Sequence, residues 1–193
     1  MCLWTVVLIG FLELSHGGLV GLMSSGIGEG SYISLSFLAN GSATAVTLAE
    51  DKASSLTSDS AMDTKNRIHY LFEDGFVLRH FNITARAFSK QKYVDLDPCT
   101  GAGECVDELF WDPHRNVLLT VAMGLHGNNT LATLDPITGK LMALPHTNFS
   151  QLCDLFEGGA AHDSVKQIMY VTLDCAVACR CPSRTHYLLL RRQ

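Results

Sequence analysis

The stretch "WDPHRNVLLTVAMGLHGNNTLATLDPITGKLMAL", residues 111–144, alternates apolar runs with two turn signals. In "DPHRN" and "DPITG" the aspartate can accept hydrogen bonds from the backbone of its own turn, and the proline presets φ. Gly139 can take the positive φ that leads into the next strand. The runs around these turns are rich in Val, Leu, Phe and Thr, which favours strands. The pattern predicts strands over residues 106–111, 117–122, 130–135 and 140–144.

This unit recurs along the chain. "AMDTKNRIHYLF", "FWDPHRNVLLTV" and "AHDSVKQIMYVTL" each contain an aspartate, a polar turn, a basic residue with an amide, and then a strand. Asp63, Asp112 and Asp163 are 49 and 51 residues apart. The stretch 32–48 also matches 129–144, about two periods later. A fixed period near ~50 residues indicates a repeat architecture. The alignment further equates Lys65 with Arg115 and Lys166, and Asn66 with Asn116 and Gln167.

Four strands fit into each period, and no segment sustains the i, i+3, i+4, i+7 pattern of a helical solenoid. Four antiparallel strands per ~50 residues is typical of a β-propeller blade. Over about residues 19–190 the chain resembles the blades of YVTN, NHL or quinoprotein-type propellers. The WD dipeptide of WD40 repeats and the paired glycines of kelch repeats are absent, and no catalytic motif of a propeller enzyme is present. The predicted fold is therefore all-β, a propeller-like array of four-stranded antiparallel blades.

The predicted array is incomplete. The units run over about 18–50, 51–98, 99–150 and 151–193, and they hold strands 2–4 of one blade, two whole blades and strands 1–3 of a fourth. This makes 3 + 4 + 4 + 3 = 14 strands, or about 3.5 blades, whereas closed propellers have 4–8. We therefore expect an open or truncated partial propeller with "HYLLL", residues 186–190, as an exposed or poorly ordered edge. Such an edge favours self-association, because unpaired strand edges template pairing with another chain.

The N-terminal segment predicts a secretory signal peptide over residues 1–17. Residues 2–12 are mostly apolar, and Ser15 and Gly17 have the spacing of positions −3 and −1 of a cleavage site. A basic segment before the run is missing and Glu13 comes late in it, so a buried N-terminal strand or an uncleaved anchor is the alternative. No later stretch is long and apolar enough to span a bilayer. The net charge of −5 argues against non-specific nucleic-acid binding.

Two further features favour a secreted, extracellular glycoprotein. Removal of the leader takes Cys2 and leaves an even number of cysteines, which suits an oxidising compartment. Four N-x-S/T sequons also occur, each at an expected loop or strand end. The six remaining cysteines are Cys99, Cys105, Cys153, Cys175, Cys179 and Cys181. The sequons are at Asn40, Asn82, Asn128 and Asn148.

The cysteines are disulfide candidates, although six cysteines allow 15 pairings. Loop spacing favours Cys99 with Cys105 and Cys175 with Cys181, which leaves Cys179 for Cys153. The alternative is a metal site in "CAVACRC", which needs thiolates in a reducing cell or histidines from elsewhere. The disulfide interpretation is preferred because it agrees with the leader and the sequons.

Other candidate chemistry is weak. The acidic stretch "YVDLDPCTGAGECVDELFWD" lacks the ligand spacing of an EF-hand and is interpreted as a solvated loop. The histidines show no HxH or HExxH spacing, and no G-x-S-x-G elbow is present. Asp63, Asp112 and Asp163 recur in every repeat, so they are interpreted as turn residues and not as catalytic carboxylates. We predict no catalytic residue, cofactor or metal site.

The preferred function is a secreted or cell-surface glycoprotein whose propeller-like blades bind a protein or glycan partner. Propellers carry many functions, so the fold alone implies no more. One alternative is a fragment of a secreted propeller enzyme of the hydrolase, lactonase or quinoprotein type. Another is a truncated product with no independent activity. Bound calcium or a quinone in the purified protein would favour the enzyme.

Overall fold

The structure is a computed structural model that describes the greater part of the chain. Within the described residues it is all-β, every pair of neighbouring strands is antiparallel, and no helix occurs. The predicted all-β antiparallel class is thus confirmed. In this part of the chain no helix is long and apolar enough to cross a membrane. The described residues are 8–13, 18–26, 29–37, 42–51, 59–73, 76–90, 92–95, 106–125, 128–148, 153–175 and 184–191.

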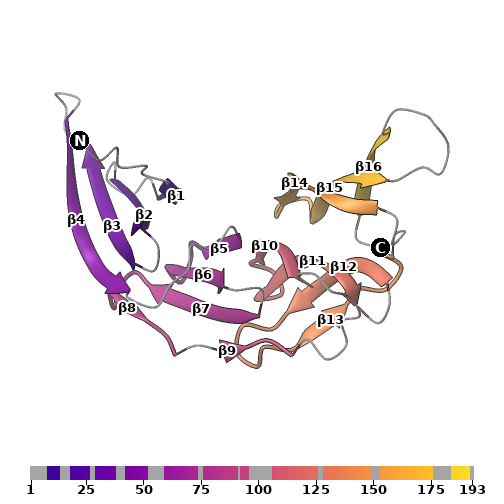
Figure 1. The fold of residues 1–193 in the computed structure, drawn as a ribbon, viewed down its shortest axis with the longest axis horizontal. Helices are drawn as coiled ribbons and strands as arrows, with labels where there is room; N and C mark the ends of the chain where they lie inside the picture. The colour runs from indigo at the N-terminus through magenta and orange to yellow at the C-terminus, as the bar shows by residue number, and fades with distance from the viewer. Residues whose placement is uncertain are drawn as a thin grey trace.

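The strands form four sheets that follow one another along the chain, and Figure 1 shows these sheets arranged along an open arc. The first sheet contains β1 (Leu8–Glu13), β2 (Gly18–Gly26), β3 (Glu29–Phe37) and β4 (Ala43–Asp51). The second contains β5 (Asp59–Asp63), β6 (Ile68–Glu73), β7 (Val77–Asn82), β8 (Ala87–Phe88) and β9 (Lys92–Tyr93). The third contains β10 (Val106–Asp112), β11 (Val117–Leu125), β12 (Asn128–Leu134) and β13 (Leu141–Ala143). The fourth contains β14 (Cys153–Asp163), β15 (Ile168–Cys175) and β16 (Arg184–Arg191).

Apolar residues fill the layers between consecutive sheets. Side chains on a strand alternate between its two faces, so a strand with a sheet on each side must be apolar on both. On β6, Tyr70 and Phe72 join the core shared with the third sheet, while Leu71 joins the core on the side of the first. On β11, Leu118 faces the second sheet and Val121 faces the fourth. This two-sided burial explains why the strands of the inner sheets read as nearly continuous apolar runs.

The first strands of three sheets are neighbours in space. β10 contacts β5 on one side and β14 on the other, and Figure 1 shows these strands on the concave side of the arc. Adjacent residues of β10 point to different sheets. The ring of Trp111 stacks on Tyr70 of the second sheet at 5.2 Å between centroids, whereas the ring of Phe110 lies 6.4 Å from His162 of the fourth. The repeats are therefore held together by contacts close to their first strands.

The predicted total of 14 strands was wrong. The first sheet has a first strand, β1, because residues 8–13 pair with β2 over their whole length. The second sheet has its outer position divided between β8 and β9, which both pair with β7. An apolar run of this length suits a leader and a strand equally well, which is why the sequence did not distinguish them. The fourth sheet has three strands in the described residues, with β16 at its edge.

The spacing of β1 and β2 matches that of the later repeats. β1 ends at Glu13 and β2 begins at Gly18, the same interval as from Asp63 to Ile68 and from Asp112 to Val117. Glu13 also continues the period, since 63 − 13 = 50, beside the later steps of 49 and 51. The repeat thus extends into the segment predicted to be the leader.

Candidate functional site

Five turns in the described residues share one construction, in which an Asp or Asn at the end of a strand begins the turn and the residue four positions later has a positive φ. In the turn at Asp112, Oδ1 accepts the N–H of His114 at 2.9 Å, and the main-chain oxygen accepts the N–H of Asn116 at 2.9 Å. In the turn at Asp135, Oδ1 accepts the N–H of Ile137 at 2.8 Å. We call these the Asx turns; they begin at Asp63, Asn82, Asp112, Asp135 and Asp163.

The position with positive φ is fixed by its distance from the Asx residue and not by its own type. Arg67, Asn116 and Gln167 have φ values of 57°, 54° and 55°. The sequence alignment had equated Asn66 with Asn116, which was one residue out. Asn66 instead donates its N–H to Oδ1 of Asp63 at 3.1 Å. An arginine in the left-handed region is strained relative to Gly or Asn, so residue type misled the alignment.

The Asx turns lie at one end of the array. Alternate turns of an up-and-down sheet lie at the same end of that sheet, so the turns at Asp63 and Asn82 are neighbours. The N–H of Ile83 donates to the main-chain oxygen of Arg67 at 3.0 Å, which joins these two turns. The stack of Tyr70 on Trp111, each close to an Asx turn, shows that the second and third sheets point the same way. We call this surface the Asx-turn end.

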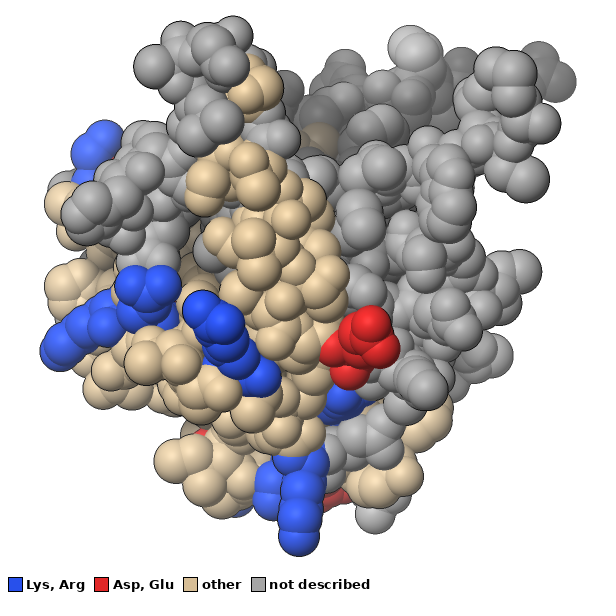
Figure 2. Space-filling view, turned by 90° about the vertical axis from the view of Figure 1, so that its left-hand side faces the viewer, with Lys and Arg blue, Asp and Glu red and all other residues tan. Residues whose placement is uncertain are grey.

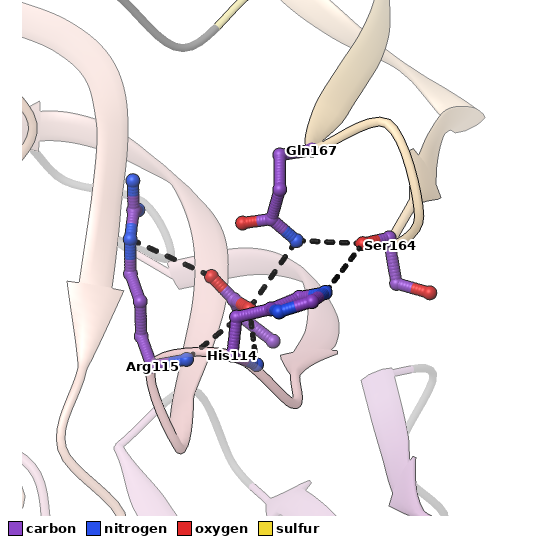
Figure 3. A network of polar contacts seen from close by, with 5 residues as sticks. His114, Arg115, Ser164 and Gln167 are labelled. Atoms are coloured by element: carbon purple, nitrogen blue, oxygen red, sulfur yellow. Dashed lines mark hydrogen bonds and ion pairs between the residues drawn. The ribbon is translucent and has the colours of Figure 1, made fainter.

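A polar clasp joins the third and fourth sheets at this end. The amide of Gln167 donates to the main-chain oxygen of Ser164 at 2.7 Å and to Oδ1 of Asp112 at 3.4 Å (Figure 3). The ring nitrogen Nε2 of His114 lies 3.1 Å from the same oxygen of Ser164. Nε of Arg115 lies 3.7 Å from Oδ2 of Asp112. The Asx turn of the fourth sheet therefore contacts the Asx turn at Asp112 of the third sheet.

The carboxylates of Asp112 and Asp163, which occupy equivalent positions, differ in exposure. The side chain of Asp112 is 0% exposed, whereas that of Asp163 is 29% exposed. Asp163 accepts the N–H of Val165 at 3.1 Å and of Lys166 at 2.9 Å, so its own turn is intact. What differs is the neighbour, because Gln167 of the fourth sheet contacts Asp112. The side chain of Asp163 is thus accessible at its turn, whereas the side chain of Asp112 is buried at the equivalent position.

Two titratable groups beside the clasp have shifted pKa values. Burial lowers the pKa of His162, and the carboxylates of Asp112 and Asp163 partly oppose that shift. The main-chain N–H that Lys166 donates to the carboxylate is the main cause that lowers the pKa of Asp163. Asp163 is therefore ionised over the physiological range. The chemistry of the site is hydrogen bonding and charge, which suits recognition.

Apolar and basic side chains are exposed around the Asx turns. Ile137 and Val165 lie at the tips of two of these turns and are 80% and 88% exposed. Figure 2 views the molecule from the side of the first and second sheets and shows basic side chains spread over its described surface. Exposed aliphatic residues beside cations are typical of protein contact surfaces, in which an apolar centre has a polar rim. The exposed cations of the second sheet and the segment after it are Lys65, Arg86, Lys90 and Lys92.

The predicted glycosylation residues have different settings. Asn148 is exposed, and Asn82 is half-buried with its Oδ1 accepting the N–H of Ala85 at 2.8 Å. Asn128 begins β12, and Thr130 of the same sequon is buried with its hydroxyl 2.7 Å from that of Thr147. A glycan at Asn128 would therefore have to be added before folding. Asn40 lies outside the described residues.

Of the six cysteines in the predicted pairs, the structure describes Cys153 and Cys175. Cys153 and Cys175 end the ladder of β14 and β15 and lie opposite each other, an arrangement that the sequence did not predict. Cys99, Cys105, Cys179 and Cys181 lie outside the described residues. In the part of the chain that the structure describes, no group of three or more His, Cys, Asp or Glu residues could hold a metal ion.

Sequence reasoning missed the clasp residues His114, Ser164 and Gln167. Gln167 was visible as the amide position of its repeat, but its contact with Asp112 spans 55 residues and depends on how sheets stack. The strand β10 also contains a bulge at Glu108, which has a φ of 57°. The hydroxyl of Thr120 donates to the main-chain oxygen of Asp107 at 3.0 Å and satisfies the backbone there. No sequence signal indicated this bulge.

No protein-family model matches the chain, and no curated protein matches it. Among solved structures, the complex of the fission yeast SREBP-SCAP binding domains is similar with a TM-score of 0.56 at 11% identity. This match covers 100% of the chain and 52% of that structure's chain, so the protein spans about half of its length. The likeness concerns the fold alone.

Two further structures are less similar. The extracellular domain of a hybrid two component system from B. thetaiotaomicron has a TM-score of 0.49 at 13% identity, over 91% of this chain and 21% of that one. Saccharomyces cerevisiae Sqt1 has a TM-score of 0.43 at 13% identity, over 81% of this chain and 38% of that one.

Proposed function

We propose that the chain is a partial β-propeller with a binding function and no catalytic one. The consecutive up-and-down sheets, the cores between them and the adjacent first strands β5, β10 and β14 support this arrangement. In a propeller each sheet is a blade and its first strand faces the axis. The arc of Figure 1 corresponds to an open part of such a ring.

The partner-binding surface in this proposal is the Asx-turn end. The observation that carries it is the difference between Asp112, which the next sheet covers, and Asp163, which stays open. Val165 and Ile137 add exposed apolar tips to the same end. A protein is the preferred partner, because large exposed aliphatic residues are buried most effectively by another protein. The neighbour with the greatest likeness in fold reported above is named for its binding domains, which agrees with this choice.

The compartment in this proposal is extracellular, on the basis of the leader, the sequons and the cysteines. Expression in mammalian cells is expected to yield secreted protein that begins near Gly18, and therefore lacks β1, and that shifts in mass on treatment with a glycosidase. N-terminal sequencing and mass spectrometry provide the measurement. Secreted protein that keeps residues 8–13 would retain β1. This result would contradict the predicted cleavage but not the extracellular compartment. An unglycosylated cytosolic product with Met1 intact would reject the compartment.

Binding is tested with the secreted protein on panels of cell-surface ectodomains and of glycans. Val165→Glu and Ile137→Glu are each expected to weaken binding of a partner at least 10-fold, because a charge would be buried at the centre of the contact. Val46→Glu is the matched control. Val46 is an aliphatic residue with 50% exposure on β4, a strand that none of the described Asx turns adjoins, and its replacement should leave affinity unchanged. Equal losses for all three variants would place the surface elsewhere, and glycan binding alone would change the class of partner.

A further inference from the structure

Cys153 and Cys175 occupy directly opposed positions in the antiparallel ladder of β14 and β15. Opposed residues in such a ladder have Cα atoms about 4.5 or 5.5 Å apart. Disulfides join residues whose Cα atoms are about 4.4–6.8 Å apart. The register alone thus brings these two cysteines within disulfide range with no movement of the backbone.

The neighbouring ladder also fixes the register of Cys175. On its far side β15 pairs with β16, and the residue opposite Cys175 is Arg184. Cys181, the other partner considered for Cys175, lies outside the described residues. Cys175 is therefore fixed by two ladders in a position that faces Cys153.

A link at this point would join a short part of the ladder of β14 and β15. Its register shifts between Leu155 and Ala160, so three pairs at the open end are separated from the pairs beside the Asx turn. Those three pairs run from Cys153 opposite Cys175 to Leu155 opposite Leu173. A covalent link at the last pair would prevent this short segment from separating.

We infer that Cys153 and Cys175 form a cross-strand disulfide, in place of the sequence-based pairing of Cys175 with Cys181 and Cys153 with Cys179. The two thiols lose two protons and two electrons as the S–S bond forms. A disulfide such as oxidised glutathione accepts them and is reduced to two thiols. This inference rests on strand register and does not depend on the proposed binding function.

The test uses the full chain, purified and equilibrated in a buffer of reduced and oxidised glutathione. After alkylation of free thiols and removal of any glycan, trypsin digestion without reduction is followed by mass spectrometry. Cleavage after Lys140, Lys166 and Arg180 places Cys153 in peptide 141–166, and both Cys175 and Cys179 in peptide 167–180. The cross-linked pair of peptides is expected in the unaltered chain.

The variants identify which cysteine is joined. The cross-link should persist in Cys179→Ser and in the control Cys105→Ser, and it should disappear in Cys175→Ser. Loss of the cross-link in Cys179→Ser, or its persistence in Cys175→Ser, would overturn the inference in favour of Cys153 with Cys179. Alkylated Cys153 in the unaltered chain would also overturn it. Cys179→Ser keeps both proposed partners, so it decides the question even if other variants fail to fold. Because the assay is done on purified protein, failure of secretion would leave its result intact.

Discussion

Replacing Asp112 by alanine is expected to lower the free energy of unfolding by about 2–3 kcal/mol. The carboxylate is fully buried, and its Oδ1 accepts hydrogen bonds from the N–H groups of His114 and Arg115 and from the amide of Gln167. Alanine would leave these three donors without the acceptor that they share at a buried position. Urea unfolding of the purified chain, followed by circular dichroism, measures the loss.

Two matched variants separate the contributions. Asp112→Asn should lose much less, because an amide oxygen can accept the same bonds, as Asn82 does in its own turn. Asp163→Ala should also lose less, since water can replace a carboxylate that is already exposed. Equal losses for Asp112→Ala and Asp163→Ala would show that cover by the next sheet contributes nothing. A double-mutant cycle of Asp112→Ala with Gln167→Ala then isolates the bond between the sheets.

The sequence predicted the strands of the third sheet well, because each lies between turns with a local mechanism. Asp112 with Pro113 and Asp135 with Gly139 both fix their turns through neighbours within four residues. The all-β class followed from the same signals. Features decided within one turn were therefore accessible from the sequence.

Features that depend on contacts between repeats could not be predicted from the sequence. Asp63, Asp112 and Asp163 look alike in the sequence, yet only stacking of sheets determines which carboxylate is covered. Cys153 faces Cys175 only because the register of β14 shifts by a bulge between Leu155 and Ala160, which no local signal specifies. Residues 8–13 form β1 and also lie in the predicted leader, because hydrophobicity does not distinguish an apolar strand from a secretory segment.

The third sheet shows how this division arises physically. Its turns are fixed by hydrogen bonds within four residues, whereas the aromatic contacts of Phe110 and Trp111 join residues of different repeats. The candidate binding surface also depends on contacts between repeats, since it is formed by turns of different sheets that lie at one end of the array. A sequence with recognisable turns thus specifies the repeats before it specifies the surface that they form together.

Acid is expected to destabilise the protein through His69, which is fully buried on β6. His69 lies opposite Met62 of β5 and Phe81 of β7, both of which belong to the core between the first and second sheets. Burial lowers the pKa of His69 from 6.5 to about 4. The folded protein therefore resists taking up a proton that the unfolded chain accepts near its ordinary pKa.

The sign of the effect follows from this difference. Above pH 6.5 neither state is protonated at His69, so its full contribution to stability is present. Between pH 6.5 and 4 the unfolded state binds the proton and the folded state does not, so the free energy of unfolding falls as the pH falls. With 1.36 kcal/mol per pKa unit the loss amounts to up to about 3 kcal/mol. Burial lowers the pKa of His80 and of His162 as well, which adds to the loss in the same direction.

The measurement is urea unfolding at a series of pH values from 7.5 to 4, for the unaltered chain and two variants. His69→Gln removes the titrating group, so its stability should decline with falling pH less steeply than that of the unaltered chain. His146→Gln, which replaces an exposed histidine, should keep the original slope. Comparing slopes within each protein makes the result independent of any stability that glutamine itself costs in the core. Parallel curves for the unaltered chain and His69→Gln would show that His69 takes up its proton equally well in the folded and unfolded states.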